Sequence, residues 1–238
     1  MRPCLPCFAI LLLAGCSANS EKRVAREAAA AMTGSPETLT AVSSLTLEGH
    51  GTGSDAGGAF TIASYTRSTS YRRSQWRQEQ TRVTAPANAT EVRRGGFDGK
   101  AAYDENPDGT IARLPQQEAR RRRIEIYHHP VGLLLAVFSN AATLTNTRTE
   151  GNLAAVDITL GGVIYSLYID AATKLPAKIV SAEAGEVLET SFSQYVTLHG
   201  YKLPGRIVAK RDGQVTSDLT ITRQFAGPDL GSLGTPGA

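Results

Sequence analysis

From about residue 45 onward, apolar and polar residues alternate along most of the chain. Leu45-Thr46-Leu47 and Phe60-Thr61-Ile62 each place two apolar side chains on one side of an extended backbone. A period of two is typical of strands that are buried on one face. After residue 142 the pattern continues, and turn residues interrupt it about every ten positions, as in antiparallel meanders. The pattern therefore predicts an antiparallel sheet of many strands.

Glycine-rich and Asp-Gly segments divide the predicted strands. Gly49–Gly58 contains five glycines and is predicted to be the turn of a hairpin. Phe97-Asp98-Gly99-Lys100 is predicted to be a second, tighter hairpin. The reason is that Asp-Gly favours the left-handed backbone that a two-residue turn requires.

Three segments have the composition or periodicity of helices instead. Lys22–Met32 is rich in Ala, Glu, Lys and Arg, which favour a helix by intrinsic propensity. Gln116–Tyr127 places Glu118 and Arg122 one turn apart, a spacing that allows an ion pair. Val131–Phe138 is apolar on every side. Such a helix is either ordinary core or the wall of a ligand cavity, and the sequence leaves both interpretations open.

These elements predict a mainly β protein of the α+β class. Their order is an N-terminal helix, about four strands, a central pair of helices and then about six strands. A long sheet curls, and a short apolar helix docked in its concave side would hide the apolar surfaces of both. We therefore expect one large curved antiparallel sheet, a half-barrel. Its concave face would be covered by the N-terminal helix and the central helical insert.

The N-terminal residues have the features of an export signal. Arg2 precedes the apolar run Leu5–Leu13, which is too short to span a bilayer core, because that takes about 20 residues. Its length and flanks match the apolar region of a signal peptide. The run leads into Leu13-Ala14-Gly15-Cys16, which resembles the lipobox of bacterial lipoproteins. An ordinary signal peptide that happens to contain a cysteine is the alternative.

The lipobox resemblance implies that residues 1–15 are removed as a signal peptide. Cys16 would then be lipidated, with palmitate as a typical acyl group, and would anchor the mature chain to a membrane. A single acyl chain binds a membrane only weakly, whereas the two or three chains implied here would hold the protein stably. Ser17 stands where an Asp would signal retention in the inner membrane. We therefore expect a cell-envelope protein on the outer membrane, facing the periplasm, with residues 16–22 as a short tether.

Composition narrows the classes of function. The chain carries 25 basic and 22 acidic residues, and so even a balance argues against nucleic acid as the main partner. Cys4 and Cys7 have the spacing of a redox motif, but both lie in the segment that is expected to be removed. We expect one domain over residues 23–225, long enough to bury a large core. Residues 226–238 are rich in Gly and Pro and are expected to form a disordered tail.

Residues with catalytic or metal-binding chemistry are few and scattered. His128 and His129 are adjacent, so on a helix their side chains would diverge and would not readily hold one metal ion. We expect His128-His129-Pro130 to mark a helix end, where partial negative charge favours a cationic ring. No motif places a serine nucleophile beside a base. The sequence therefore predicts no enzyme activity, no metal site and no cofactor.

Four consecutive arginines stand in the predicted helix that begins at Gln116. They radiate around the helix, so they cannot all be buried. One interpretation is a solvated face with ion pairs to Glu118 and Glu125. The other is contact with an anionic surface, where each basic residue contributes about 1 kcal/mol. The candidates for that contact are Arg120, Arg121, Arg122 and Arg123.

Several segments carry a family resemblance. Ala41–Gly49 follows the Ala-rich helix, Phe97–Tyr103 contains the Asp-Gly turn, and Thr197–Val208 with Arg211–Val215 closes the chain. Together, over about residues 24–225, they resemble the lipoprotein-localisation factors, the LolA/LolB/LppX-like half-barrels. The resemblance implies an open curved sheet with helices plugging its concave face around an apolar cavity. It also implies proteins that carry or receive lipoproteins or lipids, and it identifies no individual acyl-binding residue.

Two hypotheses follow. The first is a periplasm-facing lipoprotein that binds a lipid or acyl chain in an apolar half-barrel cavity, with a role in lipoprotein or lipid trafficking. The second is a structural or interaction lipoprotein of the cell envelope with a fully packed core and no ligand. The expected partners are the membrane through Cys16, a lipid or acyl-chain ligand, and a lipoprotein cargo or envelope protein. The expected cavity-lining residues are Phe60, Ile62, Trp76, Phe97, Leu134, Phe138, Ile158 and Leu167.

Overall fold

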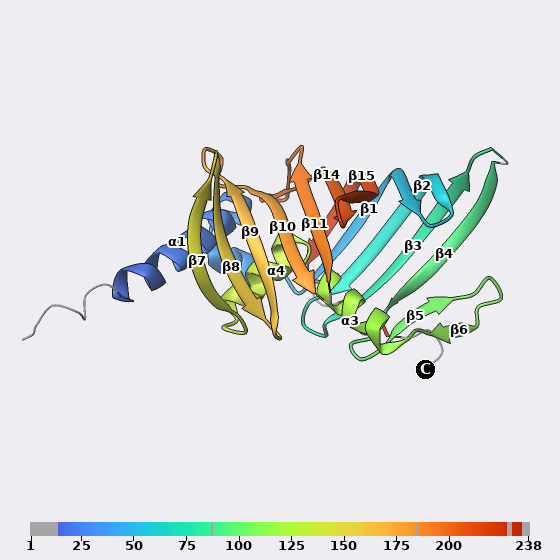
Figure 1. The fold of residues 1–238 in the computed structure, drawn as a ribbon, viewed down its shortest axis with the longest axis horizontal. Coiled ribbons are helices and arrows are strands. Elements are labelled where there is room, and N and C mark those ends of the chain that lie inside the picture. Colours follow the sequence, from blue (N-terminus) through green and yellow to red (C-terminus); the bar gives the residue numbers. More distant parts are fainter. Residues whose placement is uncertain (1–13, 87, 184, 228–229, 235–238) are drawn as a thin grey trace, which may run out of the picture.

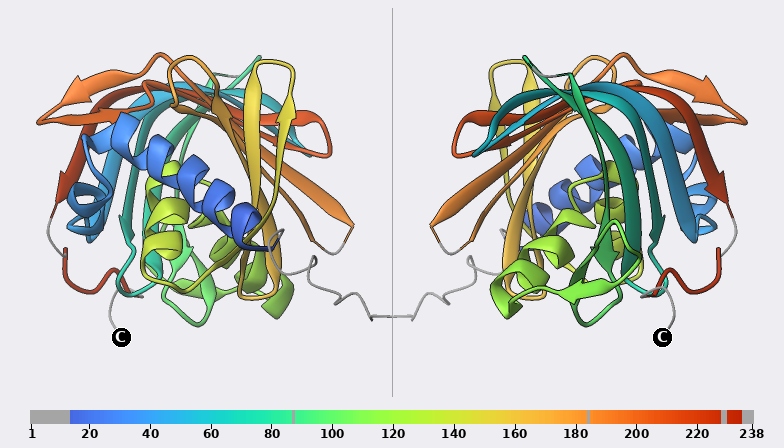
Figure 2. Two further views of the ribbon diagram at one scale, coloured as in Figure 1. Left: turned by 90° about the vertical axis from the view of Figure 1, so that its left-hand side faces the viewer. Right: turned by 90° about the vertical axis from the view of Figure 1, so that its right-hand side faces the viewer.

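The computed structural model describes residues 14–86, 88–183, 185–227 and 230–234, with side chains from Ser20 onward. Within this part of the chain, thirteen strands form one antiparallel sheet that does not close on itself. Figure 1 shows the sheet as a long curved surface, and the end-on views of Figure 2 show that it arches over the helices. The mainly β half-barrel predicted from the sequence is confirmed.

Short hairpins connect most of the strands. The described residues form six strands before the central helices and nine after them. The first group is β1 (Ser44–Asp55), β2 (Gly58–Ser70), β3 (Gln75–Thr84), β4 (Ala89–Phe97), β5 (Ala102–Glu105) and β6 (Ile111–Arg113). The second group is β7 (Thr143–Glu150), β8 (Leu153–Leu160), β9 (Val163–Asp170), β10 (Pro176–Glu183), β11 (Glu186–Ser193), β12 (Val196–Leu198), β13 (Tyr201–Leu203), β14 (Arg206–Arg211) and β15 (Gln214–Gly227).

The order of strands in the sheet is nearly sequential. From one edge to the other it runs β6-β5-β4-β3-β2-β1-β15-β14-β11-β10-β9-β8-β7, and β12 with β13 forms a separate small hairpin. Because β15 pairs with β1, the first and last strands meet in the middle of the sheet. The sequence predicted fewer strands, since β5, β6, β12 and β13 have only three or four residues each. Alternation over so few positions is too short to recognise.

β1 runs through the glycine-rich segment that was predicted to be a turn. Gly49–Asp55 belongs to this strand and pairs with β2, so only the next two residues turn. A Cβ atom at Gly49 or Gly51 would overlap the carbonyl oxygen of Thr220 or Asp218 in β15. The pairing register of β1 also shifts at this point. The glycines therefore allow a close approach of two strands and a sharp bend of the sheet.

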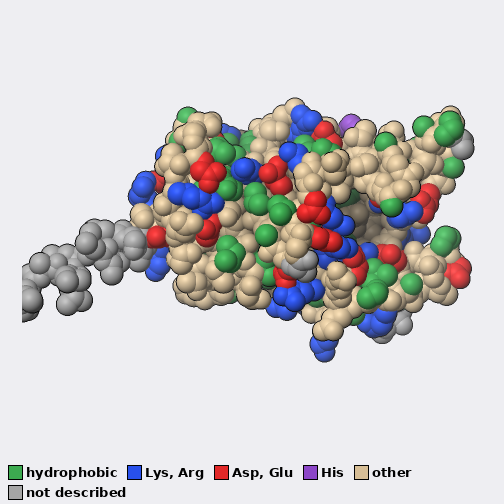
Figure 3. Space-filling model, viewed as in Figure 1, with side chains coloured by type: hydrophobic (Ala, Val, Ile, Leu, Met, Phe, Trp, Pro, Cys, Tyr) green, Lys and Arg blue, Asp and Glu red, His purple; other side chains and the backbone are tan. Residues whose placement is uncertain are grey.

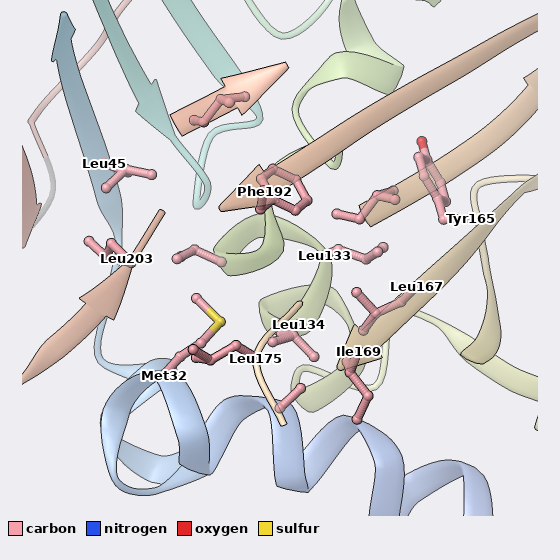
Figure 4. Close-up of a cluster of buried hydrophobic side chains, with 14 of the residues drawn as sticks. Met32, Leu45, Leu133, Leu134, Tyr165, Leu167, Ile169, Leu175, Phe192 and Leu203 are labelled. Carbon is pink, nitrogen blue, oxygen red and sulfur yellow. The ribbon is translucent and has the colours of Figure 1, made fainter. Parts of the chain in front are cut away.

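Helices fill one half of the concave face. α1 (Ala14–Thr33) packs on β7 and β8 and contacts α4 (Pro130–Phe138), which lies under the same half of the sheet. Figure 4 shows Leu133 and Leu134 of α4 among side chains of α1 and β9. Both leucines are fully buried. The apolar segment over α4 is therefore core, which was one of the two interpretations left open.

Two shorter helices complete the set in the described residues. α2 (Pro36–Thr40) follows α1 and is capped by Ser35, whose Oγ accepts the Thr38 N–H. α3 (Gln116–Glu125) lies against β4 and β5, at the other end of the sheet from α1. The predicted pair between Glu118 and Arg122 forms, with 3.5 Å between Arg122 Nε and Glu118 Oε1.

α1 is longer than predicted. It begins at Ala14, so residues 16–22, expected to form a tether, are helical. No glycine or proline interrupts the chain between Cys16 and Met32, and Ala, Glu, Lys and Arg all favour continuation. Residues 1–13, most of the predicted signal peptide, lie outside the described residues. No described helix has the length and apolar character needed to cross a membrane.

The predicted start of the C-terminal tail, residue 226, was also too early in the chain. β15 extends to Gly227, and Ala226 pairs with Leu45 of β1. Further on, the Leu233 N–H donates to Gln75 Oε1 at 3.1 Å. Of the predicted tail, residues 228–229 and 235–238 lie outside the described part of the chain.

Candidate functional site

The half of the concave face that α1 and α4 leave uncovered forms a hollow of about 560 Å³, which we call the basin. Its walls come mainly from the inner faces of β1–β4, β11, β14 and β15, with α3 at one side. Figure 3 shows the hollow in the right-hand part of the surface, with acidic and basic side chains at its border. Cavities that hold small ligands typically measure about 300–1,000 Å³. The basin has the size of a ligand site.

The floor of the basin is apolar. Leu47, Phe60 and Ile62 line it from β1 and β2, and Ile207 and Leu219 line it from β14 and β15. Each is less than a tenth exposed. Phe60 and Ile62 face inward because they are two positions apart on one strand. Such a floor can receive an apolar chain, since burial of apolar surface contributes about 25 cal/mol per Å².

Arg67 and Trp76 form a stacked pair in the basin wall. A register shift between Ile62 and Ser64 changes the alternation of β2, after which Tyr65 and Arg67 line the basin. The guanidinium carbon of Arg67 lies 4.2 Å from the ring centroid of Trp76, a cation–π contact. The indole N–H of Trp76, the one tryptophan of the chain, donates to the Arg122 carbonyl oxygen at 2.9 Å.

Most other charged side chains around the basin are held in ion pairs. Arg82 lies 2.8 Å from Asp55 and covers the ring of Phe60, with 4.1 Å between the guanidinium carbon and the ring centroid. Lys210 lies 3.0 Å from Glu189. These pairs fix the border of the basin and surround the apolar floor with charge.

His128 and His129 line the basin between α3 and α4, and both are buried. Thr190 Oγ1 lies 3.0 Å from His128 Nδ1, and Ser181 Oγ lies 2.7 Å from His128 Nε2. Burial lowers the pKa of His128 to about 4 and that of His129 to about 3, and the positive charge of Arg67 acts in the same direction. Both rings are therefore neutral at pH 7.

The expectation of a cationic ring at a helix end is wrong for a structural reason. α3 ends at Glu125, and His129 is the N-cap of α4, where its Nδ1 accepts the Val131 N–H at 3.3 Å. The N-terminus of a helix carries partial positive charge, which favours a neutral acceptor over a cation.

The predicted cavity-lining residues divide between the basin and the core. Phe60, Ile62 and Trp76 line the basin. Phe97 lies instead in a small separate cluster with Trp76. The assignment of the remaining residues to a cavity wall is corrected, because α1 and α4 occupy that half of the concave face, as Figure 4 shows for two of them. The residues in the main core, or packed against it, are Leu134, Phe138, Ile158 and Leu167.

The arginine cluster on α3 is engaged partly with the protein itself. Arg121 lies 2.8 Å from Glu186. Arg122 lies 2.7 Å from Asp104 and donates to the carbonyl oxygens of Gly96 and Tyr103. Both arginines also pair with Glu118 as predicted, whereas Glu125 contacts Arg67. Contact with an anionic surface stays a prediction, and the two exposed members of the cluster that would make it are Arg120, which also pairs with Glu183, and Arg123.

Sequence reasoning missed Arg67 and the β14–β15 part of the floor, and it assigned His128 and His129 to a helix end without placing them at the basin. Alternation in Tyr65-Thr66-Arg67 places Arg67 on the same face as Tyr65. From sequence alone, however, an arginine in a strand is assigned to the solvent-exposed face, because the curvature of the sheet around it is not known. Within the part of the chain that the structure describes, no three His, Cys, Asp or Glu side chains gather in a group that could hold a metal ion.

Comparison with known proteins identifies the fold. No protein-family model and no curated protein matches the sequence. A LolA superfamily protein from Nitrosomonas europaea superimposes with a TM-score of 0.54 at 11% identity, covering 90% of this chain and 94% of that one. A DUF1329 family protein from Desulfovibrio piger gives 0.54 at 10% identity, covering 89% and 94%. At such low identity the likeness concerns the backbone alone, and it shows that this chain has the LolA-like half-barrel fold.

Proposed function

We propose that the protein binds a lipid or an acyl chain in the basin and serves lipid or lipoprotein trafficking in the cell envelope. The observation that supports this most directly is the apolar floor of the basin, which α1 and α4 do not cover. One half of the concave face is filled by α1 and α4, yet Leu47, Phe60, Ile62 and Leu219 border a hollow in the other half. An apolar ligand would bury this floor in the way that α4 buries the facing half.

We also propose that Cys16 carries the lipid anchor and places the protein on the outer membrane, facing the periplasm. Cys16 lies in α1, eight residues before Val24, which is buried in the core. Eight helical residues span about 12 Å, so the half of the sheet that α1 covers would sit close to the membrane surface. A Cys16→Ser variant is expected to lose incorporation of labelled palmitate and to leave the membrane fraction. Labelling that persists in the variant would contradict the anchor.

The proposed role is binding without chemistry. His128 is the described base closest to a hydroxyl of the basin, that of Thr190. Both of its ring nitrogens are within hydrogen-bond distance of hydroxyl groups, and its pKa of about 4 makes it a weak base at neutral pH. A catalytic base works best with a pKa near the working pH.

The test is native mass spectrometry of the full chain carrying Cys16→Ser, so that no attached acyl group can enter the basin. Co-purified lipid and uptake of a fluorescent fatty acid are expected. Phe60→Gln places an amide on the floor and should weaken fatty-acid binding about tenfold, equivalent to about 1.4 kcal/mol. Thr61→Gln is the matched control, since Thr61 is exposed on the opposite face of the same strand.

A lipid-free mass together with no fatty-acid uptake would contradict lipid binding. The alternative, an interaction lipoprotein that docks a partner in the envelope, would then be the better account. Equal loss of binding in the two variants would show that the floor of the basin is not the site.

A further inference from the structure

The acidic side chains of the basin are already matched by cations. Each carboxylate that lines the basin, apart from Glu125, has an arginine or lysine nitrogen within 3.0 Å. These ion pairs offset the negative charge of the carboxylates and leave little of it for a cationic ligand. The carboxylates are Glu91, Asp104, Glu105, Glu118 and Glu189.

Arg67 is different, because its charge is poorly matched. Among the described residues, Glu125 is its one carboxylate neighbour within 4 Å, and the nitrogen–oxygen distance is 3.7 Å. That distance is too long for a charge-assisted hydrogen bond, which typically measures about 2.7–2.9 Å. The Arg67 side chain is only 17% exposed, and it presents five N–H donors. The guanidinium also stacks on the face of Trp76 and lies beside the Tyr65 hydroxyl.

Two further donors of basin residues lack an acceptor. His129 Nδ1 accepts the Val131 N–H, so in the neutral ring the proton sits on Nε2. That buried Nε2 has no hydrogen-bond partner, and neither has Nε of Arg211, which lies 3.9 Å from Glu186 Oε2. Among the described basin residues these are the buried side-chain atoms without a partner, and both are donors. A buried donor without an acceptor is costly, and a ligand oxygen relieves that cost.

We propose that the basin takes an amphiphile with an anionic head group, a carboxylate or a phosphate, which Arg67 binds while the apolar chain lies on the floor formed by Phe60, Ile62 and Leu219. The inference rests on the proposed lipid-binding function and specifies in addition that the head group of the ligand is negatively charged. Arg67, Phe60 and Ile62 lie on β2, and Leu219 lies on β15, on the far side of β1; all four line the basin, so one molecule can reach both the guanidinium and the floor. A guanidinium suits either head group because its fork of donors matches two oxygens.

Ligand binding can be measured by the quenching of Trp76 fluorescence. Trp76 is the one tryptophan of the chain and stacks on Arg67, so a bromine-labelled chain in the basin will quench its fluorescence. The probes are dibromostearate and its methyl ester, which share the chain and differ in the charge of the head. They are titrated into the full chain carrying Cys16→Ser after removal of co-purified lipid. The anion is expected to bind at least about tenfold more tightly than the ester.

Variants test whether Arg67 causes this preference. Arg67→Gln should weaken dibromostearate about tenfold and leave the ester unchanged, whereas Arg67→Lys should keep part of the preference. Arg82→Gln is the matched control, because this substitution removes the same charge from the neighbouring strand of the basin. Unlike Arg67, Arg82 is closely paired with a carboxylate, that of Asp55. Hexadecyl phosphate, hexadecanoate and hexadecanol as competitors distinguish a phosphate from a carboxylate head.

Each outcome has one meaning. Equal binding of anion and ester by the unmodified basin would overturn the anionic head group and leave lipid binding intact. The assignment to Arg67 would also be overturned if Arg82→Gln reduced the preference for the anion over the ester as much as Arg67→Gln. The overall positive potential of the basin would then explain the preference, and a specific contact with Arg67 would not. If neither probe quenches Trp76, the proposed function itself fails. The comparison of the two probes on the unmodified basin remains decisive even if an Arg67 variant does not fold.

Discussion

His128 and His129 remain neutral because the fold surrounds them with core residues and hydroxyl groups. His129 packs edge-on against Phe192, with ring centroids 6.1 Å apart, and His128 against Tyr165 at 5.8 Å. Adjacent histidines before a proline gave no sign of this in the sequence. Whether such a pair is exposed or buried depends on where the following helix docks, and α4 docks in the core.

Protonation of these histidines opposes folding. Their folded-state pKa values, about 4 and about 3, lie below the ordinary value of 6.5. Below pH 6.5 the unfolded chain therefore binds more protons, and the free energy of unfolding falls as the pH falls toward 4. Each histidine contributes a slope of about 1.4 kcal/mol per pH unit in this range.

His129→Asn isolates one of these contributions. Asn accepts the N-cap hydrogen bond but does not titrate. In urea unfolding between pH 6 and pH 4.5, the variant should lose stability less steeply, by about 1.4 kcal/mol per pH unit. Parallel pH profiles for the two proteins would show that His129 is not buried in its neutral form.

At the scale of elements, β1 depends on glycines that sequence reading assigned to a turn. Ala at Gly51 would place a methyl group on the Asp218 carbonyl oxygen. Gly51→Ala is therefore expected to lower the free energy of unfolding by about 1–3 kcal/mol. Gly227→Ala is the control, because a Cβ there meets no atom within 4 Å. Equal urea midpoints for the two variants would contradict the close approach of β1 and β15.

α4 allows a second prediction, because it was expected to be either core or cavity wall. Leu134 is fully buried, whereas Phe138 is only partly buried against the core. Leu134→Ala should cost about 2–5 kcal/mol of stability, and the folded fraction should bind dibromostearate normally. Phe138→Ala should cost less. A large loss of binding by folded Leu134→Ala would place α4 in the ligand site after all.

The elements that the sequence predicted well are those whose side chains alternate over many residues. Tyr165, Leu167 and Ile169 of β9 stand at alternate positions of their strand, and all three are buried. The short strands and the glycine-rich part of β1 were missed because their pairing depends on neighbours far away in the chain. β1, for example, pairs with a strand about 170 residues later.

At the scale of the whole molecule, packing is concentrated in one half of the sheet. The main core cluster joins α1 and α4 to β8–β10 and continues into the apolar floor of the basin, while the cluster under α3 contains only five buried residues, among them Trp76 and Phe97. The sequence predicted that helices would cover the concave face. It did not show which half they would leave open, because that depends on the docking of α1 and α4. Leu134, Phe138, Ile158 and Leu167 were therefore expected in a cavity wall but lie in or against the main core, and Phe97 lies in the separate cluster under α3.

This asymmetry predicts the pattern of hydrogen exchange. Amides of β8, β9 and α4 should exchange most slowly, and those of β5 and β6 at the sheet edge should exchange fastest among the strands. Addition of hexadecanoate should slow exchange in β2 and β3, which border the basin, and leave β8 and β9 unchanged. Uniform slowing across the sheet would show instead that the ligand stabilises the molecule as a whole.

The separation of a filled half from an open half also bears on how such a sheet can evolve. On the proposed function, substitutions on the basin floor would alter which ligand binds, while the packed half holds the backbone in place. Selection can therefore change ligand preference with little loss of foldability. A fold shared with proteins that are only 10–11% identical in sequence is what this division of labour permits.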